Sequence, residues 1–340
     1  MEQGGRRSGR ERCVLLLCLA TLLLPPPART AAADWSAIAE NKVYYTNDVV
    51  VFSAARRLAV HEDPTQPTKV EIGKPQDVVW APALEVMRKS TSGQWPTEVS
   101  FKTQGFVYTD HPIFNHGMYR LHLKQALSPD TALVLRYRYT PNLFLGPNNE
   151  RRSGQRLVEE ERVTSHIWRA MLERRFTEDF QATLITRYGL RLFNGPFAER
   201  DTHFWGLGSE AHYRMTSRLA FTLGYLYERG LADGRNQPQF NDDVSYRNHF
   251  VSFGSTIRMT EPLTLVLTYT YQRNNFTSAF AADTSYGRED DTNQGIAEFR
   301  YALTGRATVS LGVQRTQRDS NRTSASFQNT NTWVGGQYQF

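Results

Sequence analysis

Two short stretches of the sequence combine residue types that could carry out acid–base or metal chemistry. The first, His111 to His116, holds two histidines and Asn115 next to Asp110. Histidine nitrogens bind transition metals, so this stretch could form a site with His122 as a third ligand. A nucleophilic site would need a serine beside the histidine, and none lies nearby in the sequence. Spacing of this kind is weak support for a site, and a polar loop explains the same residues.

The second stretch pairs Glu210 with His212 on one side of an alternating segment, with Arg214 next on that side. A carboxylate beside an imidazole can act in general acid–base catalysis, but a cluster of charges on one strand face explains it equally well. Both cysteines, Cys13 and Cys18, lie in the first 33 residues. The rest of the chain therefore has no thiolate nucleophile and no cysteine metal site. We expect no enzyme activity, no cofactor and no metal.

Alternation of apolar and polar residues is the main pattern of the chain, and it would position these side chains. In Leu263–Arg273, Leu and Tyr take every second position, and Thr, Val and Gln lie between them. A period of two is typical of β-strands. We predict about 14 such strands: Asp48–Leu58, Asp77–Ser90, Thr97–Thr109, Gly117–Leu127, Thr131–Thr140, Arg162–Arg175, Phe180–Phe193, His203–Arg214, Leu219–Arg229, Ser245–Arg258, Leu263–Arg273, Asp291–Leu303, Arg306–Gln317 and Ser326–Phe340.

The links between these strands alternate in length. Short links follow every second strand (91–96, 128–130, 176–179, 215–218, 259–262 and 304–305), and the others, such as 59–76 and 141–161, are mostly longer and polar. Short turns at one end and long loops at the other are typical of transmembrane β-barrels, whereas soluble barrels have no reason to sort their loops. The sequence predicts an all-β, antiparallel transmembrane barrel of about 14 strands, with 12 or 16 also compatible, and both termini on the short-turn, periplasmic side.

The N-terminal residues have the features of a secretory signal peptide. A basic segment from Arg6 to Arg12 precedes the apolar run Val14–Leu24, and Ala31–Ala33 offers a cleavage site after Ala33. The run has 11 residues, whereas a spanning helix needs about 20. Removing residues 1–33 lowers the formal net charge from +6 to +3, which gives no reason to expect nucleic acid as a partner. We expect residues 34–47 to be a short periplasmic segment and residues 48–340 to form the barrel.

The chain ends on an aromatic residue inside its last alternating stretch. Val334, Gly336, Tyr338 and Phe340 share one face there. From about Asp48 to Phe340 the chain resembles Gram-negative outer-membrane β-barrels, in the company of monomeric porins and porin-like barrels, through its pattern and its terminus. The resemblance implies contact with outer-membrane lipid and lipopolysaccharide. It also implies that Tyr338 and Phe340 form part of the signal read by the barrel-assembly machinery. A barrel of this size can stand alone, so we expect a monomer.

The polar face of each strand is expected to line the lumen, because a charge on the lipid face costs roughly 2–4 kcal/mol at mid-membrane. The basic residues on that face are Lys102, Arg120, Lys124, Arg136, Arg138, Arg187, Arg191, Arg214, Arg258 and Arg300. The acidic ones are Glu85, Glu98, Glu173, Glu210, Glu228 and Glu298. Rings of Arg and Lys in a pore favour anions, which gives the hypothesis of a weak anion preference. Alternatively, Arg–Glu pairs hold the wall together and leave little net field.

The sequence thus predicts an outer-membrane channel for passive diffusion of small polar solutes, with anions favoured. A second hypothesis is a barrel that does not conduct and that acts in polysaccharide export, as an assembly or adhesion factor, or as the scaffold of an electron conduit. Only about 14 residues (34–47) precede the first predicted strand, and a large N-terminal domain would have favoured this second hypothesis. A third hypothesis is an outer-membrane barrel hydrolase.

Overall fold

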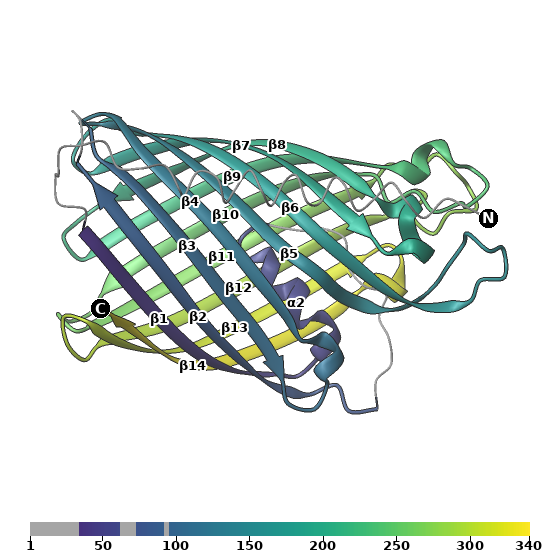
Figure 1. The fold of residues 1–340 in the computed structure, drawn as a ribbon, viewed down its shortest axis with the longest axis horizontal. Coiled ribbons are helices and arrows are strands. Elements are labelled where there is room, and N and C mark those ends of the chain that lie inside the picture. Colours follow the sequence, from purple (N-terminus) through teal and green to yellow (C-terminus); the bar gives the residue numbers. More distant parts are fainter. Residues whose placement is uncertain (1–33, 62–72, 92–94) are drawn as a thin grey trace.

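The computed structural model describes residues 34–61, 73–91 and 95–340, and their strands form one closed antiparallel barrel (Figure 1). Each strand pairs with its neighbours in the sequence, and the first strand pairs with the last. The strands are β1 (Asp34–Thr46), β2 (Asp77–Ser90), β3 (Thr97–Tyr108), β4 (His116–Ser128), β5 (Thr131–Asn149), β6 (Val158–Arg175), β7 (Phe180–Phe193), β8 (Thr202–Arg214), β9 (Leu219–Ala232), β10 (Tyr246–Arg258), β11 (Leu263–Phe276), β12 (Glu289–Ala302), β13 (Ala307–Ser320) and β14 (Phe327–Gln339).

Helical structure in the described ranges is limited to short segments. They are the α-helix α2 (Val49–Leu58) and the 3-10 helices η1 (Pro112–Phe114), η2 (Gly195–Arg200), η3 (Asp233–Asn236) and η4 (Thr323–Ala325). Within those ranges, none has both the length and the hydrophobicity that a membrane-spanning helix requires.

The predicted sorting of the connections is confirmed. The short turns lie at the same end of the barrel as the start of β1 and the end of β14, and the long loops lie at the other end (Figure 1). Four of the turns are built alike, around Thr177, Thr216, Thr260 and Thr304. In each, the threonine hydroxyl accepts a backbone N–H three residues further along the chain. A hydroxyl that bonds its own backbone in this way favours a tight turn.

The prediction for the start of the barrel was wrong. Residues 34–46, expected to form a periplasmic segment, are strand β1, which pairs with β2 along its length and with β14 from Ile38 to Thr46. The barrel therefore starts at residue 34 and not at 48. The alternation in β1 is weakened by Asn41, which lies on the outer face and accepts a hydrogen bond from Trp80 Nε1 at 2.6 Å. The strand number of 14 is confirmed, with a different first strand.

The segment expected as the first strand, Asp48–Leu58, instead contains helix α2. Its three consecutive valines favour a strand by propensity. The Asp48 carboxylate, however, accepts the N–H of Val50 at 3.0 Å and caps the helix. The following Ala54–Leu58 consists of good helix formers. The predicted signal peptide and its cleavage site fall in residues 1–33, outside the described part of the chain.

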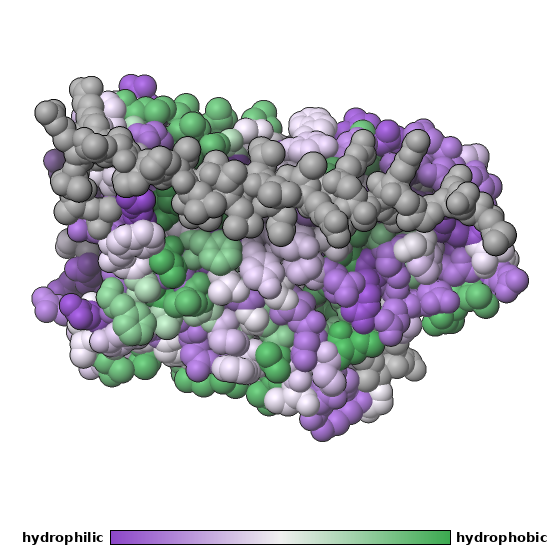
Figure 2. All heavy atoms as spheres, in the orientation of Figure 1, coloured by the Kyte–Doolittle hydropathy of each residue, from purple (hydrophilic) through white to green (hydrophobic). Residues whose placement is uncertain are grey.

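The outer surface of the barrel carries apolar side chains that remain exposed in the isolated chain. Leu184, Leu207, Leu223 and Leu311 are each more than half exposed, at 55%, 52%, 57% and 60%. Hydrophobic residues are interspersed over the visible strands in Figure 2, and hydrophilic residues gather toward the long-loop end. An apolar exterior on a closed barrel is the surface that such a fold presents to lipid.

Three glycines on the inner face each lie under an aromatic ring of the neighbouring strand. Gly189 faces Phe204, Gly230 faces Tyr246 and Gly312 faces Trp333. A Cβ atom at these glycines would lie 2.2, 2.2 and 2.1 Å from the nearest ring atom. The ring therefore takes the space that a side chain would fill, and it packs flat on the backbone of the next strand.

We predict that Gly189→Ala destabilises the barrel, because its methyl group would collide with the ring of Phe204, which is fully buried. Overpacking of this kind costs about 1–3 kcal/mol. The matched control is Gly295→Ala, since nothing lies within 4 Å of a Cβ at Gly295. The stability of both variants is measured as the urea concentration at the midpoint of unfolding. The folded fraction at each concentration is read from a gel, on which the folded barrel and the heat-unfolded chain migrate differently. Equal midpoints for the two variants would contradict the prediction.

Candidate functional site

Helix α2 lies inside the barrel and crosses its lumen (Figure 1). Near its start, Val50 and Phe52 pack with Val79 of β2 and Phe106 of β3. At its other end, Leu58 packs in a cluster with inward-facing residues of β5, β6, β7, β9 and β10: Val134, Met171, Ile185, Leu226 and Phe250. The helix therefore contacts widely separated parts of the wall and narrows the lumen.

Polar side chains of the wall bind the carbonyl groups of this segment. A helix leaves its last four carbonyls without intrahelical partners. The Ala55 carbonyl accepts from Gln294 Nε2 at 2.6 Å and from Gln314 Nε2 at 2.9 Å. The His61 carbonyl, just beyond the helix, accepts from the Arg187 guanidinium. Donors from β12, β13 and β7 thus hold the helix end in the lumen.

Arg56 fixes the helix to a further part of the wall. Its guanidinium lies 3.7 Å from the ring centre of Phe106 and donates to His116 Nε2 at 3.0 Å. Burial lowers the pKa of Arg56 to about 10, so the group keeps its charge at neutral pH. The cation–π contact and the hydrogen bond supply the stabilisation that a buried guanidinium needs.

Five arginines form two rows on the inner face of β4 to β7. Arg136 of β5 faces Arg169 of β6, and Arg169 faces Arg187 of β7. Arg120 of β4 faces Arg138 of β5. Side chains directly opposed on antiparallel strands are about 4.5–5.5 Å apart at Cβ, and like charges so placed repel each other. One side of the lumen therefore carries a dense band of guanidinium groups.

Several charged side chains of the lumen, Arg120 of the rows among them, form ion pairs with one another. The ion pairs and their nitrogen–oxygen distances are Lys102–Glu40 (2.7 Å), Arg120–Glu85 (2.9 Å), Lys124–Glu173 (2.7 Å), Lys42–Glu298 (2.9 Å) and Arg300–Glu298 (2.5 Å). They agree with the alternative interpretation of the sequence, in which pairs of basic and acidic side chains stabilise the barrel wall. In the rows on β4 to β7, where Arg120 takes part in one of these pairs, basic side chains of adjacent strands lie directly opposite one another.

A buried network joins Arg187 and Arg191 to Glu228 of β9. Both arginines form ion pairs with this carboxylate, the Arg191 pair at 3.5 Å. Tyr246 donates its hydroxyl to Glu228 at 2.6 Å and accepts from Arg191 at 2.5 Å. All four side chains are almost completely buried. Removing one member of such a network leaves an uncompensated charge, which is strongly destabilising.

The remaining predicted pore residues lie toward the short-turn end of the barrel. Arg214 pairs there with Asp179 of the turn at 2.7 Å, and both side chains are about half exposed. Arg258 is the exposed last residue of β10. Glu210 is half-buried on β8 and faces Thr183 of β7. The structure thus places Arg214 and Arg258 at the rim of the barrel.

The histidines singled out in the sequence bind separate partners. His111 Nδ1 lies 2.9 Å from a carboxylate oxygen of Asp77. The Asp77 carboxylate also accepts the backbone N–H groups of Asp110 and His111. His116 donates from Nδ1 to the Phe114 carbonyl at 2.8 Å and accepts from Arg56. His212 lies 3.2 Å from the Thr222 hydroxyl. Across the described ranges no group of three His, Cys, Asp or Glu residues could hold a metal ion.

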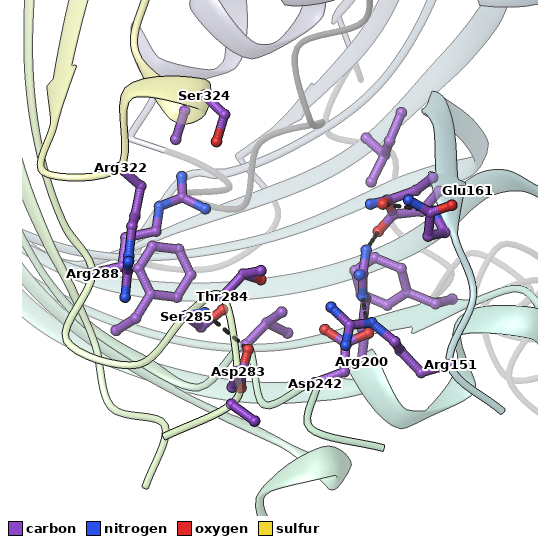
Figure 3. A pocket seen from close by; sticks show the side chains of 18 of the residues that line it. Arg151, Glu161, Arg200, Asp242, Asp283, Thr284, Ser285, Arg288, Arg322 and Ser324 are labelled. Carbon is purple, nitrogen blue, oxygen red and sulfur yellow. Dashed lines mark hydrogen bonds and ion pairs between the residues drawn. The ribbon is translucent and has the colours of Figure 1, made fainter. Parts of the chain in front are cut away.

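A cavity of about 500 Å³ opens among the long loops (Figure 3). Arg200 lies on one side of it and binds two carboxylates, Glu161 and Asp242, each at 2.8 Å. Asp283 anchors the loop that precedes β12, because its carboxylate accepts from Ser278 Oγ and from the backbone N–H groups of Asp243 and Ser285. Burial raises the pKa of Asp283 above its usual value, and these hydrogen bonds oppose the shift.

The C-terminal aromatics lie on the outer face of β14. The rings of Tyr338 and Phe340 are 4.8 Å apart, and both are exposed. The Phe340 N–H donates to the Ala37 carbonyl of β1 at 2.9 Å, so the last residue takes part in closing the barrel. Their role as an insertion signal stays a prediction.

Sequence reasoning missed several residues of the lumen. Glu40 and Lys42 were overlooked because β1 was assigned to the periplasmic segment. Arg169 was overlooked because β6 has apolar residues on both faces, for example Ile167 inside and Trp168 outside, which obscures the alternation. The sequence analysis assigned Glu173 to the lumen. Residues an even number of positions apart share a strand face, so Arg169 could have been placed on the same face.

Comparisons with known proteins agree with this architecture. No protein-family model and no curated protein match the sequence. Among solved structures, the outer membrane channel DcaP of Acinetobacter baumannii matches with a TM-score of 0.54 and 12% identity, over 93% of this chain and 100% of that one. OmpT, an outer membrane protein of Vibrio cholerae, matches with a TM-score of 0.49 and 9% identity, over 93% and 100%. The anion-selective porin from Comamonas acidovorans matches with 0.46 and 8%, over 91% and 99%.

Identities this low establish a common fold and nothing finer. The match to the DcaP channel agrees with two features of the structure. These are the closed barrel of 14 strands and the apolar outer surface. Together they show that the chain has the closed β-barrel fold of outer-membrane porins.

Proposed function

We propose that this protein is a passive channel for small polar solutes that favours anions. The observation that carries the proposal is the row Arg136–Arg169–Arg187 on adjacent strands of the lumen wall. Basic residues that line a pore raise the local concentration of anions and repel cations. Arg187 of this row pairs with Glu228, and the side-by-side placement of three guanidinium groups is expected to set the sign of the selectivity.

Helix α2 gives the channel its second property, a narrow passage. Nine of the ten α2 residues are buried, and the helix contacts the wall on several sides. We infer that solutes pass beside α2, close to the arginine rows, and that the helix limits their size.

We predict that the refolded protein conducts in a planar bilayer, with a reversal potential in a KCl gradient of the sign expected for chloride. The double variant Arg136→Gln/Arg169→Gln should lower the permeability ratio of chloride to potassium by roughly two- to fivefold, since each guanidinium acts at short range on the passing ion. Arg174→Gln is the matched control, because Arg174 also lies on β6 but is exposed near the short-turn end. A cation-selective reversal potential would refute the anion preference. A folded protein without conductance would refute the channel and favour the non-conducting barrel.

We also predict that the double variant Gln294→Leu/Gln314→Leu increases the conductance and its fluctuations. Both amide donors to the Ala55 carbonyl are then lost, and a buried acceptor without a partner costs about 1–3 kcal/mol. The end of α2 should therefore leave the wall more often. Gln317→Leu on β13 is the control, because its side chain is exposed and contacts only Asp319 among the hydrogen bonds described. Unchanged single-channel conductance in a folded double variant would contradict the role of α2 as the constriction.

A further inference from the structure

The cavity among the long loops lies at the long-loop end of the barrel, the mouth of the proposed channel. Its lining comes from the long-loop ends of β5, β6, β7 and β11, from η2, from the segment before β10, from the loop between β11 and β12, and from η4. Its volume of about 500 Å³ falls within the range of about 300–1,000 Å³ usual for small-molecule sites. The cavity is open to solvent on one side, because Ala281, Ala282 and Ser324 of its lining are exposed.

Part of the lining is apolar. Leu145, Phe193, Val244 and Phe276 contribute to it, together with three alanines, Ala281, Ala282 and Ala325. Leu145 and Phe193 belong to a buried cluster with Leu143, which gives this part of the cavity a fixed wall. A wall of this kind suits the hydrocarbon part of a solute, because burying apolar area yields about 25 cal/mol per Å².

Two of the four arginines in the lining are neutralised within the protein. Arg200 binds Glu161 and Asp242. Arg288 binds both oxygens of Asp290, at 2.9 and 2.6 Å, and its guanidinium lies 4.4 Å from the ring centre of Phe276. These two arginines hold loops together and have little charge left for a ligand.

The other two arginines, Arg151 and Arg322, differ in this respect. No carboxylate of the described residues forms an ion pair with either of them, and the Arg322 side chain donates only to the Tyr286 carbonyl, at 2.9 Å. Figure 3 shows Arg322 on one side of the cavity and Arg151 on the opposite side. The lining also holds the carboxylates Glu161, Asp242 and Asp283. It therefore combines an apolar wall with two guanidinium groups that form no ion pair with a carboxylate of the described residues.

We propose that this cavity is a capture site for organic anions that have an apolar body, such as short-chain carboxylates. The acid group binds Arg151 or Arg322 through charge-assisted hydrogen bonds, which are stronger than neutral ones. The hydrocarbon part packs against the apolar wall. The inference deepens the proposed anion channel by naming a solute class, but the binding itself does not depend on conductance.

Three probes separate the contributions of charge and apolar body. Hexanoate carries both, acetate carries the charge alone, and hexanol carries the apolar body alone. Their binding to the full refolded chain in detergent is measured by isothermal titration calorimetry. We expect hexanoate to bind at least tenfold more tightly than either of the others. Equal binding of hexanoate and hexanol would overturn the role of the arginines, and equal binding of hexanoate and acetate would overturn the role of the apolar wall.

Variants test the site itself. Arg151→Gln/Arg322→Gln should weaken hexanoate binding by roughly tenfold or more, the loss expected for a hydrogen bond to a charged group. Arg306→Gln, in the turn before β13 at the opposite end of the barrel, should bind hexanoate as the parent protein does. Both variants change exposed or loop residues, and heat-modifiable mobility verifies that each is folded. Unchanged affinity in the folded double variant would overturn the proposal.

The outcomes for this site and for the channel can be told apart. Chloride selectivity depends on the lumen arginines of β5 to β7, whereas hexanoate binding depends on loop residues at the mouth. Hexanoate binding by a protein that is not anion-selective would refute the channel proposal and support the capture site. Anion selectivity without hexanoate binding would refute the capture site alone.

Discussion

The pairing of β1 with β14 is the constraint on which the rest of the structure depends. In a bilayer core no water can satisfy backbone N–H and C=O groups, so a sheet can span it only if it closes. Closure here runs from Ile38 opposite Gln339 to Thr46 opposite Asn331, and the Phe340 N–H extends it to Ala37. It places both ends of the barrel at the short-turn rim. The connection after β1 therefore lies at the long-loop rim, from which it can enter the lumen.

What enters the lumen is a helix, and this follows from backbone chemistry. All strand edges are used by closure, so a further extended segment would have no partner. A helix satisfies most of its own hydrogen bonds, and the wall only has to supply donors for its last carbonyls. Gln294 and Gln314 do so at the Ala55 carbonyl, and Arg187 binds the His61 carbonyl just beyond the helix. Apolar contacts of Phe52 and Leu58 then fix the two halves of α2 to different parts of the wall.

The charges of the lumen fall into groups that differ in effect. Partly exposed pairs such as Lys102–Glu40 contribute little individually and balance each other. The buried network around Glu228 is different, because its members cannot be solvated when one is lost. The rows on β4 to β7, which share Arg187 with that network, bring guanidinium groups side by side, and in the proposed channel this placement acts on a passing ion. The long-loop end of the barrel adds Arg151 and Arg322 beside an apolar wall.

The sequence by itself determined the barrel, because alternation and loop sorting reflect the energetic cost of placing polar groups in lipid. It placed β2 and β7 with the observed bounds, and it placed Arg136, Arg138 and Arg187 on the inner face. It could not distinguish β1 from α2, since a valine-rich run suits both and only ring closure decides between them. Nor could it find pairs such as Lys42 with Glu298, which lie 256 residues apart. Such contacts depend on strand register, and closure of the whole ring sets that register.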